Sequence, residues 1–181
     1  MLNIFEAHDH ERFEIYGYSF GPDDGSHMRK QIIKAIDVFV DVQEMADMDI
    51  ALLARKDKID IAIDLNGYTQ HGRPNIFACR AAPIQIHFWG TANSSGADHI
   101  DYYIGDTVNL PKEHDHHYTE SIIRLPHWYQ AVYREPQIAS APPTREEMGL
   151  PEDGFVFCCF NNSYKLSPIE FKIWMRLLDK V

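Results

Sequence analysis

Cysteine is scarce in this 181-residue chain, which has only Cys79, Cys158 and Cys159. Three cysteines without a repeated metal-ligand spacing predict neither a disulfide framework nor a zinc site. Cys158 and Cys159 stand side by side in the apolar run FVFCCF, a pattern typical of buried, reduced thiols. The sequence therefore predicts a protein of the reducing cytoplasm.

Long apolar runs and an excess of positive charge are also missing. No stretch approaches the length of a membrane-spanning helix, and the N-terminus lacks the basic and apolar regions of a secretion signal. The 17 lysines and arginines are outnumbered by 27 aspartates and glutamates, for a formal net charge of -10. Because such a surface repels phosphate backbones, we expect no membrane and no nucleic acid among the main partners.

The residues that are present favour a folded α/β protein. Hydrophobic residues make up 45% of the chain, enough for one domain-sized core or slightly more. Strand-like and helix-like patterns alternate, which favours a mostly parallel sheet covered by helices. We expect strands at 13–21, 37–42, 59–65, 83–89, 101–106, 121–126 and 154–162, and helices at 26–36, 45–58, 73–81, 145–148 and 167–181.

A proline-rich segment of small residues, QIASAPPT at 137–144, predicts a linker. It separates an N-terminal sheet domain, residues 1–136, from the start of a second lobe, residues 145–181. Ser167 and Pro168 open the last helix as its N-cap and first helical residue. One strand and one helix cannot bury both faces of a sheet, so we expect the second lobe to be incomplete and to favour self-association.

Small and polar residues follow four of the expected strands, where open parallel sheets bind ligands. They are Asn66-Gly67-Tyr68-Thr69, the loop 90–96, Gly105-Asp106-Thr107, and the segment Asn161-Asn162-Ser163-Tyr164-Lys165. Small residues let backbone N–H groups approach an anion or a sugar, and Lys165 offers a positive charge to a phosphate. Two simpler interpretations stay open: Asn66-Gly67 as a plain turn with positive φ, and Lys165 as a solvated lysine.

Other kinds of site lack their usual patterns. The run HDHH at 114–117 suggests a metal, but adjacent histidines point in different directions and HExxH is missing, so we expect a solvated loop and no metal site. The dinucleotide pattern GxGxxG, the phosphate loop GxxxxGK[ST] and the hydrolase pattern GxSxG are missing too. Nicotinamide cofactors, ATP and serine-hydrolase chemistry therefore have no direct support.

The motifs together resemble a known family. The run IDIAIDLNGYTQHGRPNIFACRAAPIQIHFWGTANSSGADHIDYYIGD, with YTESIIRLPHWYQ after it, resembles the catalytic region of the O-linked N-acetylglucosamine transferases. FEIYGYSFGPDDG and GLPEDGFVFCCFNNSYKLSP resemble further family motifs in the same order. The resemblance covers nearly the whole chain.

The resemblance implies an α/β fold in which a Rossmann-like parallel-sheet domain is half of a two-Rossmann-domain glycosyltransferase, followed by the first strand and helix of the second domain. It implies inverting transfer of N-acetylglucosamine from the donor UDP-N-acetylglucosamine to serine or threonine hydroxyls of acceptor proteins, without a cofactor or a metal. Tetratricopeptide repeats commonly precede this region in the family. Further catalytic and uridine-binding groups are expected outside residues 1–181.

The resemblance also implies roles for single residues. Lys165 corresponds to the lysine that contacts the donor diphosphate, where negative charge accumulates as UDP departs, and is the expected catalytic residue. The expected substrate-binding residues are Asn162, Gly67, Tyr68, Gly90 and Thr91.

Two other functions stay open from the sequence. One is a non-enzymatic protein-interaction module of the same fold, and the other is a different sugar-nucleotide-binding α/β enzyme. For the isolated chain we expect little or no activity, because catalysis needs both walls of the cleft to hold donor and acceptor.

Overall fold

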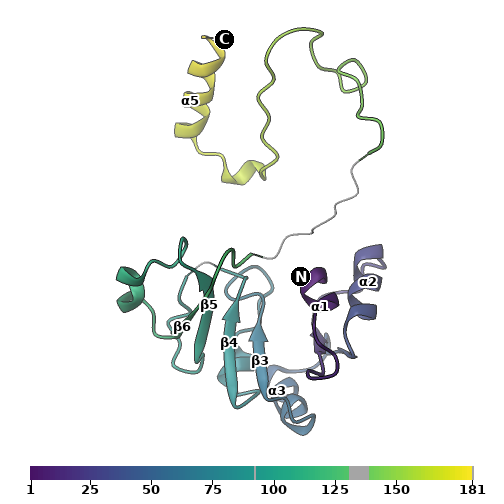
Figure 1. Cartoon of the computed structure of the whole chain (residues 1–181), viewed down its shortest axis with the longest axis vertical. Coiled ribbons are helices and arrows are strands. Elements are labelled where there is room, and N and C mark those ends of the chain that lie inside the picture. The colour runs from purple at the N-terminus through teal and green to yellow at the C-terminus, as the bar shows by residue number, and fades with distance from the viewer. Residues whose placement is uncertain (92, 131–138, 181) are drawn as a thin grey trace. The chain divides into compact units, whose positions relative to one another are not determined.

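The computed structural model describes residues 1–91, 93–130 and 139–180 (Figure 1). The chain divides into two compact units, Met1–Pro136 and Gln137–Val181, and each is described by itself.

The first unit is built on parallel sheets. The strands among its described residues are β1 (Tyr16–Ser19), β2 (Val38–Asp41), β3 (Ile61–Asp64), β4 (Ile84–Phe88), β5 (Tyr102–Asp106) and β6 (Ser121–Leu125). β1 pairs with β2, and the other sheet has the order β3-β4-β5-β6 (Figure 1). Every pairing is parallel, so the predicted α/β class is confirmed. In the larger sheet the carboxyl ends of neighbouring strands meet at one edge.

The helices of this unit follow the predicted order with shorter limits in places, except that the first one was not predicted. They are α1 (Leu2–Glu6), α2 (His27–Ala35), α3 (Asp47–Lys56), α4 (Asn75–Ala78) and the 3-10 helix η1 (Lys112–His117). Ser26 caps α2 by accepting a hydrogen bond from the backbone N–H of Arg29. The helix predicted at 73–81 is reduced to the single turn of α4, and the loop predicted at 114–117 is η1 instead.

The main core of the unit lies where α3 meets β2 and α4. Ile50, Ala51 and Ala54 are buried on one face of α3, at helical spacing. They pack with Val42, Ile76 and Ala81 in one cluster. This packing holds together the segments that precede and follow β3.

A buried glutamine fixes the connection into β4. Gln85 is fully buried, and its side-chain oxygen accepts from the Ala81 backbone N–H at 2.8 Å. Its amide nitrogen donates to the carbonyl oxygens of Phe77 and His99, at 2.9 and 2.6 Å. Because these groups of the amide are satisfied, the burial is tolerated, and α4, β4 and the segment before β5 are pinned together.

The second unit is described over residues 139–180. It holds the 3-10 turn η2 (Ser163–Lys165) and helix α5 (Pro168–Leu178). Ser167 and Glu170 form a capping box at the start of α5, so the predicted N-cap is confirmed. The helix predicted at 145–148 is a hydrogen-bonded turn, and residues 139–144 form neither helix nor strand. Positions 137–138 of the predicted linker and Val181 lie outside the described residues.

Two predictions for this unit are wrong. Residues 154–162 form no strand, and Cys158 and Cys159 are exposed instead of buried. A strand needs a partner for its backbone hydrogen bonds, and residues 139–180 contain no other strand to pair with it. The apolar side chains of this segment are therefore exposed, up to 97% for Phe160.

Within the described residues, no helix is both long enough and apolar enough to span a bilayer.

Candidate functional site

The turn after β3 is organised by the last residue of that strand. Asp64 is 9% exposed, and its Oδ1 accepts from the backbone N–H groups of Asn66 and Gly67, both at 2.9 Å. Gly67 has φ of +55°, which agrees with the alternative interpretation of Asn66-Gly67 as a turn with positive φ. A Cβ atom there would lie 2.5 Å from Cε1 of His87, so the turn needs glycine for packing as well as for conformation.

The loop after β4 lies directly against this turn. A Cβ atom on Gly90 would lie 2.1 Å from the carbonyl oxygen of Asn66, so the two backbones touch and only glycine fits. Trp89, just before it, has φ of +83°, an uncommon conformation for a large residue. The structure thus brings Gly67 and Gly90, two of the predicted substrate-binding residues, into neighbouring loops at one edge of the sheet.

Thr91, the third predicted residue of this edge, is held by its carbonyl oxygen. His87 is 1% exposed on β4, and its Nε2 lies 3.0 Å from that oxygen. The hydroxyl of Tyr103, on β5, donates to the same oxygen at 3.2 Å. Nδ1 of His87 faces Oδ2 of Asp64 at 3.7 Å, beyond direct hydrogen-bond distance. Buried polar groups of three strands thus lie side by side, because Asp64, His87 and Tyr103 are paired in register across β3, β4 and β5.

Burial and charge act in opposite directions on Asp64 and His87. Burial raises the pKa of Asp64, but the His87 imidazole and the two backbone N–H groups of the turn outweigh it, so this pKa lies below its ordinary value. Burial lowers the pKa of His87, but the Asp64 carboxylate and the Thr91 carbonyl outweigh it, so this pKa lies above its ordinary value. Both shifts favour the charged forms.

A buried carboxylate anchors the other end of the same loop. Glu120, just before β6, is 5% exposed. Its oxygens accept from Oγ of Ser94 at 2.7 Å and from the backbone N–H of Ser95 at 2.6 Å. Burial raises the pKa of Glu120, but the hydrogen bonds from Ser95 and Ser94 outweigh it and hold this pKa below its ordinary value. The loop 90–96 is therefore fixed at Thr91 and again at Ser94 and Ser95.

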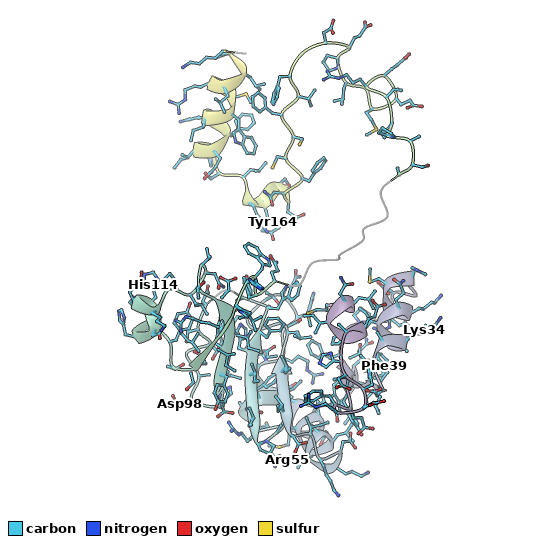
Figure 2. The ribbon with its side chains drawn as sticks, in the orientation of Figure 1. Lys34, Phe39, Arg55, Asp98, His114 and Tyr164 are labelled. Carbon is cyan, nitrogen blue, oxygen red and sulfur yellow. The ribbon has the colours of Figure 1, made fainter. Side chains whose placement is uncertain are left out.

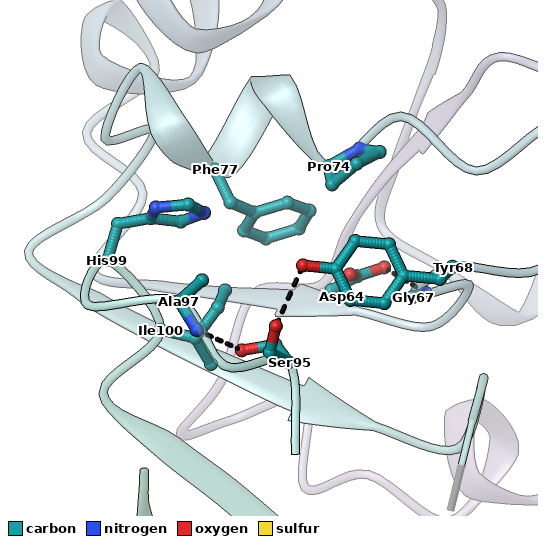
Figure 3. A pocket seen from close by; sticks show the side chains of 9 residues that line it. All are labelled: Asp64, Gly67, Tyr68, Pro74, Phe77, Ser95, Ala97, His99 and Ile100. Carbon is teal, nitrogen blue, oxygen red and sulfur yellow. Dashed lines mark hydrogen bonds between the residues drawn. The ribbon is translucent and has the colours of Figure 1, made fainter. Parts of the chain in front are cut away.

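Tyr68, the fourth predicted residue of this edge, bridges the two loops. Its hydroxyl donates to the carbonyl oxygen of Ser95 at 2.8 Å (Figure 3). Tyr68 as a whole is 62% exposed. Its bridge closes a hollow whose lining residues are Asp64, Gly67, Tyr68, Pro74, Phe77, Ser95, Ala97, His99 and Ile100 (Figure 3).

This hollow is small. Its volume is about 10 Å³, which is room for about one water molecule. It cannot enclose a sugar nucleotide. The loop ends described above therefore form no pocket that could enclose a ligand of that size.

The predicted residues of the second unit share one turn. Asn162 is the N-cap of η2, and its carbonyl oxygen accepts from the backbone N–H of Lys165 at 3.0 Å. Both side chains are exposed, and Tyr164 between them is 80% exposed (Figure 2). The turn presents an amide, a phenol and an ammonium group to solvent.

Three groups at the site escaped the sequence-based search: Asp64, His87 and Glu120. Asp64 precedes the quoted Asn-Gly turn, and its spacing of two from Asn66 is the signal of a side chain that accepts from the turn. Alternation along IQIHF places His87 on the same sheet face as Gln85, but it does not show what that face packs against. Glu120 gave no local signal, because its partners are 25 and 26 residues away.

Among the described residues, no three or more His, Cys, Asp or Glu side chains are gathered as a metal ion would require. In η1 the rings of His116 and His117 lie 3.9 Å apart. Asp115 pairs with Arg124 and not with a histidine.

The chain matches proteins of one family along its length. Residues 1–133 and 131–181 match the family described as Glycosyl transferase family 41. The chain is 36% identical over 186 residues to the probable UDP-N-acetylglucosamine–peptide N-acetylglucosaminyltransferase SEC of Arabidopsis thaliana, covering 100% of this chain and 19% of that protein. It is 35% identical over 130 residues to the UDP-N-acetylglucosamine–peptide N-acetylglucosaminyltransferase of Caenorhabditis elegans, covering 71% of this chain and 11% of that protein.

A solved structure of an O-GlcNAc transferase is also similar to this chain. A mutant of the O-GlcNAc transferase of Thermobaculum terrenum superposes with a TM-score of 0.80 at 30% identity, covering 98% of this chain and 32% of that one. The chain spans about a fifth of the length of the curated relative SEC. The chain belongs to glycosyl transferase family 41.

Proposed function

We propose that the complete protein transfers N-acetylglucosamine from UDP-N-acetylglucosamine to serine or threonine hydroxyls of acceptor proteins, with inversion at the anomeric carbon. The match to family 41 along the chain carries this proposal. The relatives in Arabidopsis and Caenorhabditis are named for this donor and for peptide acceptors. The joined loops at the strand ends of the first unit are where such a fold binds its ligand.

We propose two roles for the predicted site residues. We assign Gly67, Tyr68, Gly90 and Thr91 to the wall that faces the sugar or the acceptor. Asn162 and Lys165 would contact the donor diphosphate. The acceptor oxygen bonds to the anomeric carbon and releases its proton to solvent, while the bond from that carbon to the diphosphate oxygen breaks and its electron pair leaves with UDP. The Lys165 ammonium would stabilise that charge, so we propose a reaction that needs neither a metal nor a cofactor.

Substitution of Lys165 tests the assignment. In the complete protein, Lys165→Ala should lower kcat about 100-fold, because a positive charge at the leaving group acts mainly in the transition state. Lys172→Ala, on α5 of the same unit, is the matched control and should leave the rate unchanged. The measurements are transfer of labelled N-acetylglucosamine to protein and UDP affinity by calorimetry. An unchanged rate and UDP affinity for Lys165→Ala would contradict the assignment.

For the 181-residue chain alone we propose little or no transfer. The hollow at the strand ends has room for about one water molecule, so donor and acceptor would need further walls. Steady transfer by this chain would contradict the proposal. We also propose the cytoplasm as the compartment, since the three cysteines suggest no disulfide framework.

A protein-interaction module is the second candidate, and one observation favours it. The isoleucines on one face of the larger sheet, Ile61, Ile63, Ile84 and Ile123, are 38% to 47% exposed. Apolar side chains gathered on one face are typical of a surface that binds another protein segment. This candidate predicts a complete protein that binds a partner protein but shows no measurable affinity for UDP.

A further inference from the structure

The hydrogen-bond partners of His87 determine where its protons lie. Nε2 lies 3.0 Å from the Thr91 carbonyl oxygen, and a carbonyl only accepts, so Nε2 carries a proton. Among the described residues, no acceptor lies within hydrogen-bond distance of Nδ1, which is buried and faces Oδ2 of Asp64 at 3.7 Å. If Nδ1 carried a lone pair, that lone pair would face a carboxylate, which is unfavourable.

The ionisation state of Asp64 determines whether Nδ1 of His87 carries a proton. Its Oδ1 accepts two backbone N–H groups, from Asn66 and Gly67, which favours the anion over the acid. With Asp64 ionised, the arrangement is favourable only when Nδ1 of His87 is also protonated. The imidazolium then donates to Thr91 and faces the carboxylate with its second N–H.

Other groups near the imidazole ring of His87 also favour its positive charge. Tyr103, from β5, lies with its ring 5.2 Å from the imidazole, and burial raises the pKa of its hydroxyl, so it stays neutral. Glu120, ahead of β6, contributes a negative charge that raises the pKa of His87. Among the described residues, two carboxylates and a neutral phenol thus contact His87 or act on its charge.

We propose that Asp64 and His87 form a buried ion pair that positions the turn after β3 and the loop after β4 for sugar transfer. The pair reaches both loops at once: Asp64 holds Asn66 and Gly67, and His87 holds Thr91. These are positioning residues, because they are buried and act through Gly67 and Thr91. The catalytic consequence rests on the proposed function, while the ion pair itself does not.

The pair is intact only within a window of pH. The folded pKa of Asp64 lies below its ordinary value of 3.8, so its contribution to stability is present above 3.8 and is lost as pH falls through the folded value. The folded pKa of His87 lies above its ordinary value of 6.5, so its contribution is full below 6.5 and is lost as pH rises through the folded value. Above that point, Nδ1 loses its proton and the two loops lose their link.

The first test reads the ring directly. In the complete protein with isotope-labelled histidine, nuclear magnetic resonance should show both nitrogens of His87 protonated at pH 6, with a titration midpoint above 6.5. The signal is assigned by its loss in His87→Gln. A ring that is neutral at pH 6 overturns the proposal, whether or not the protein transfers sugar.

The second test reads the link between the loops. His87→Gln keeps a donor for Thr91 but removes the charge, and should lower kcat/KM about tenfold at pH 6.5 through misplacement of the loops. It should also remove the fall in activity that the wild type shows as His87 deprotonates. His116→Gln, on the exposed η1, is the matched control and should keep the wild-type pH profile. A His87→Gln profile that falls with the wild-type midpoint overturns the proposal.

A double-mutant cycle separates the pair from its single members. Asp64→Asn keeps an oxygen for the two N–H groups of the turn but leaves the imidazolium unpaired. Thermal unfolding should show that Asp64→Asn and His87→Gln together cost clearly less stability than the sum of the single variants. Additive costs overturn the ion pair. If the wild type transfers no sugar but His87 is an imidazolium and the stability costs are non-additive, only the proposed function is contradicted.

Discussion

A Cβ atom on Gly90 would lie 2.1 Å from the carbonyl oxygen of Asn66, well inside the closest approach of real atoms. The loop after β4 therefore rests on the turn after β3, backbone to backbone. No side chain fits between the two segments at this position. Gly90 is thus the residue at which two loops of the proposed site touch, which its identity as glycine in the sequence does not reveal.

Gly90→Ala should destabilise the protein, because the obstacle is backbone and not a flexible side chain. We expect a loss of about 2 kcal/mol in the free energy of unfolding, as for an overpacked core position. Gly21→Ala is the matched control, since nothing lies within 4 Å of its Cβ position. Chemical denaturation of both variants measures the difference, and equal stability for the two would contradict the contact.

Glu120→Gln should loosen the loop that contains Ser94 and Ser95. The amide offers one accepting oxygen where the carboxylate offers two, so at least one donor loses its partner at a cost of about 2 kcal/mol. Glu113→Gln, on the exposed η1, should cost nothing measurable.

The same carboxylate predicts a pH dependence. The folded pKa of Glu120 lies below its ordinary value of 4.5, so its contribution is present above 4.5 and is lost as pH falls through the folded value. Thermal unfolding between pH 6 and pH 3 should show a steeper loss for the wild type than for Glu120→Gln. Parallel curves would show that Glu120 is not held as an anion.

Gln85→Leu should be among the most damaging substitutions in the first unit. It leaves the Ala81 N–H without its acceptor and removes one of the two donors to each of the carbonyl oxygens of Phe77 and His99, which also accept from Arg80, at a cost of about 2 kcal/mol. The free energy of unfolding measures the loss. Gln70→Leu, at an exposed position, controls for the change of residue type.

The exposed apolar segment of the second unit should drive self-association of the 181-residue chain. Phe155, Phe157 and Phe160 are 72%, 50% and 97% exposed. Sedimentation velocity should show association that grows with concentration and weakens when Phe157 and Phe160 are both replaced by serine. A clean monomer across the concentration range would contradict this prediction.

Much of the first unit could be predicted from its periodicity. IDIAID and PIQIHF have the residues of parallel strands, and turn-forming residues follow them, so both strands and their parallel pairing were expected. Helix α4 came out shorter than expected because Pro74 and the positive φ of Arg80 limit it to one turn. The end residues of a helix depend on its packing, which the local sequence pattern does not show.

The candidate site was predictable only in part. Glycines and an Asn-Gly turn marked the loops, because conformation is a local property. The partnership of Asp64 with His87 joins residues of two strands, and that of Glu120 with Ser95 spans 25 residues. The strand expected at 154–162 failed for the same reason, because an apolar run does not reveal whether a neighbour exists to pair with it.

The spatial order of the larger sheet, β3-β4-β5-β6, is also the order in which a ribosome delivers its strands. When each new strand is synthesised, the strand with which it pairs is already present. The connections between paired strands are short, so few native contacts in this sheet depend on residues synthesised much later. The sheet can grow from one side during synthesis. The loops that build the proposed site would then assemble one after another along the growing edge, beginning with the turn after β3.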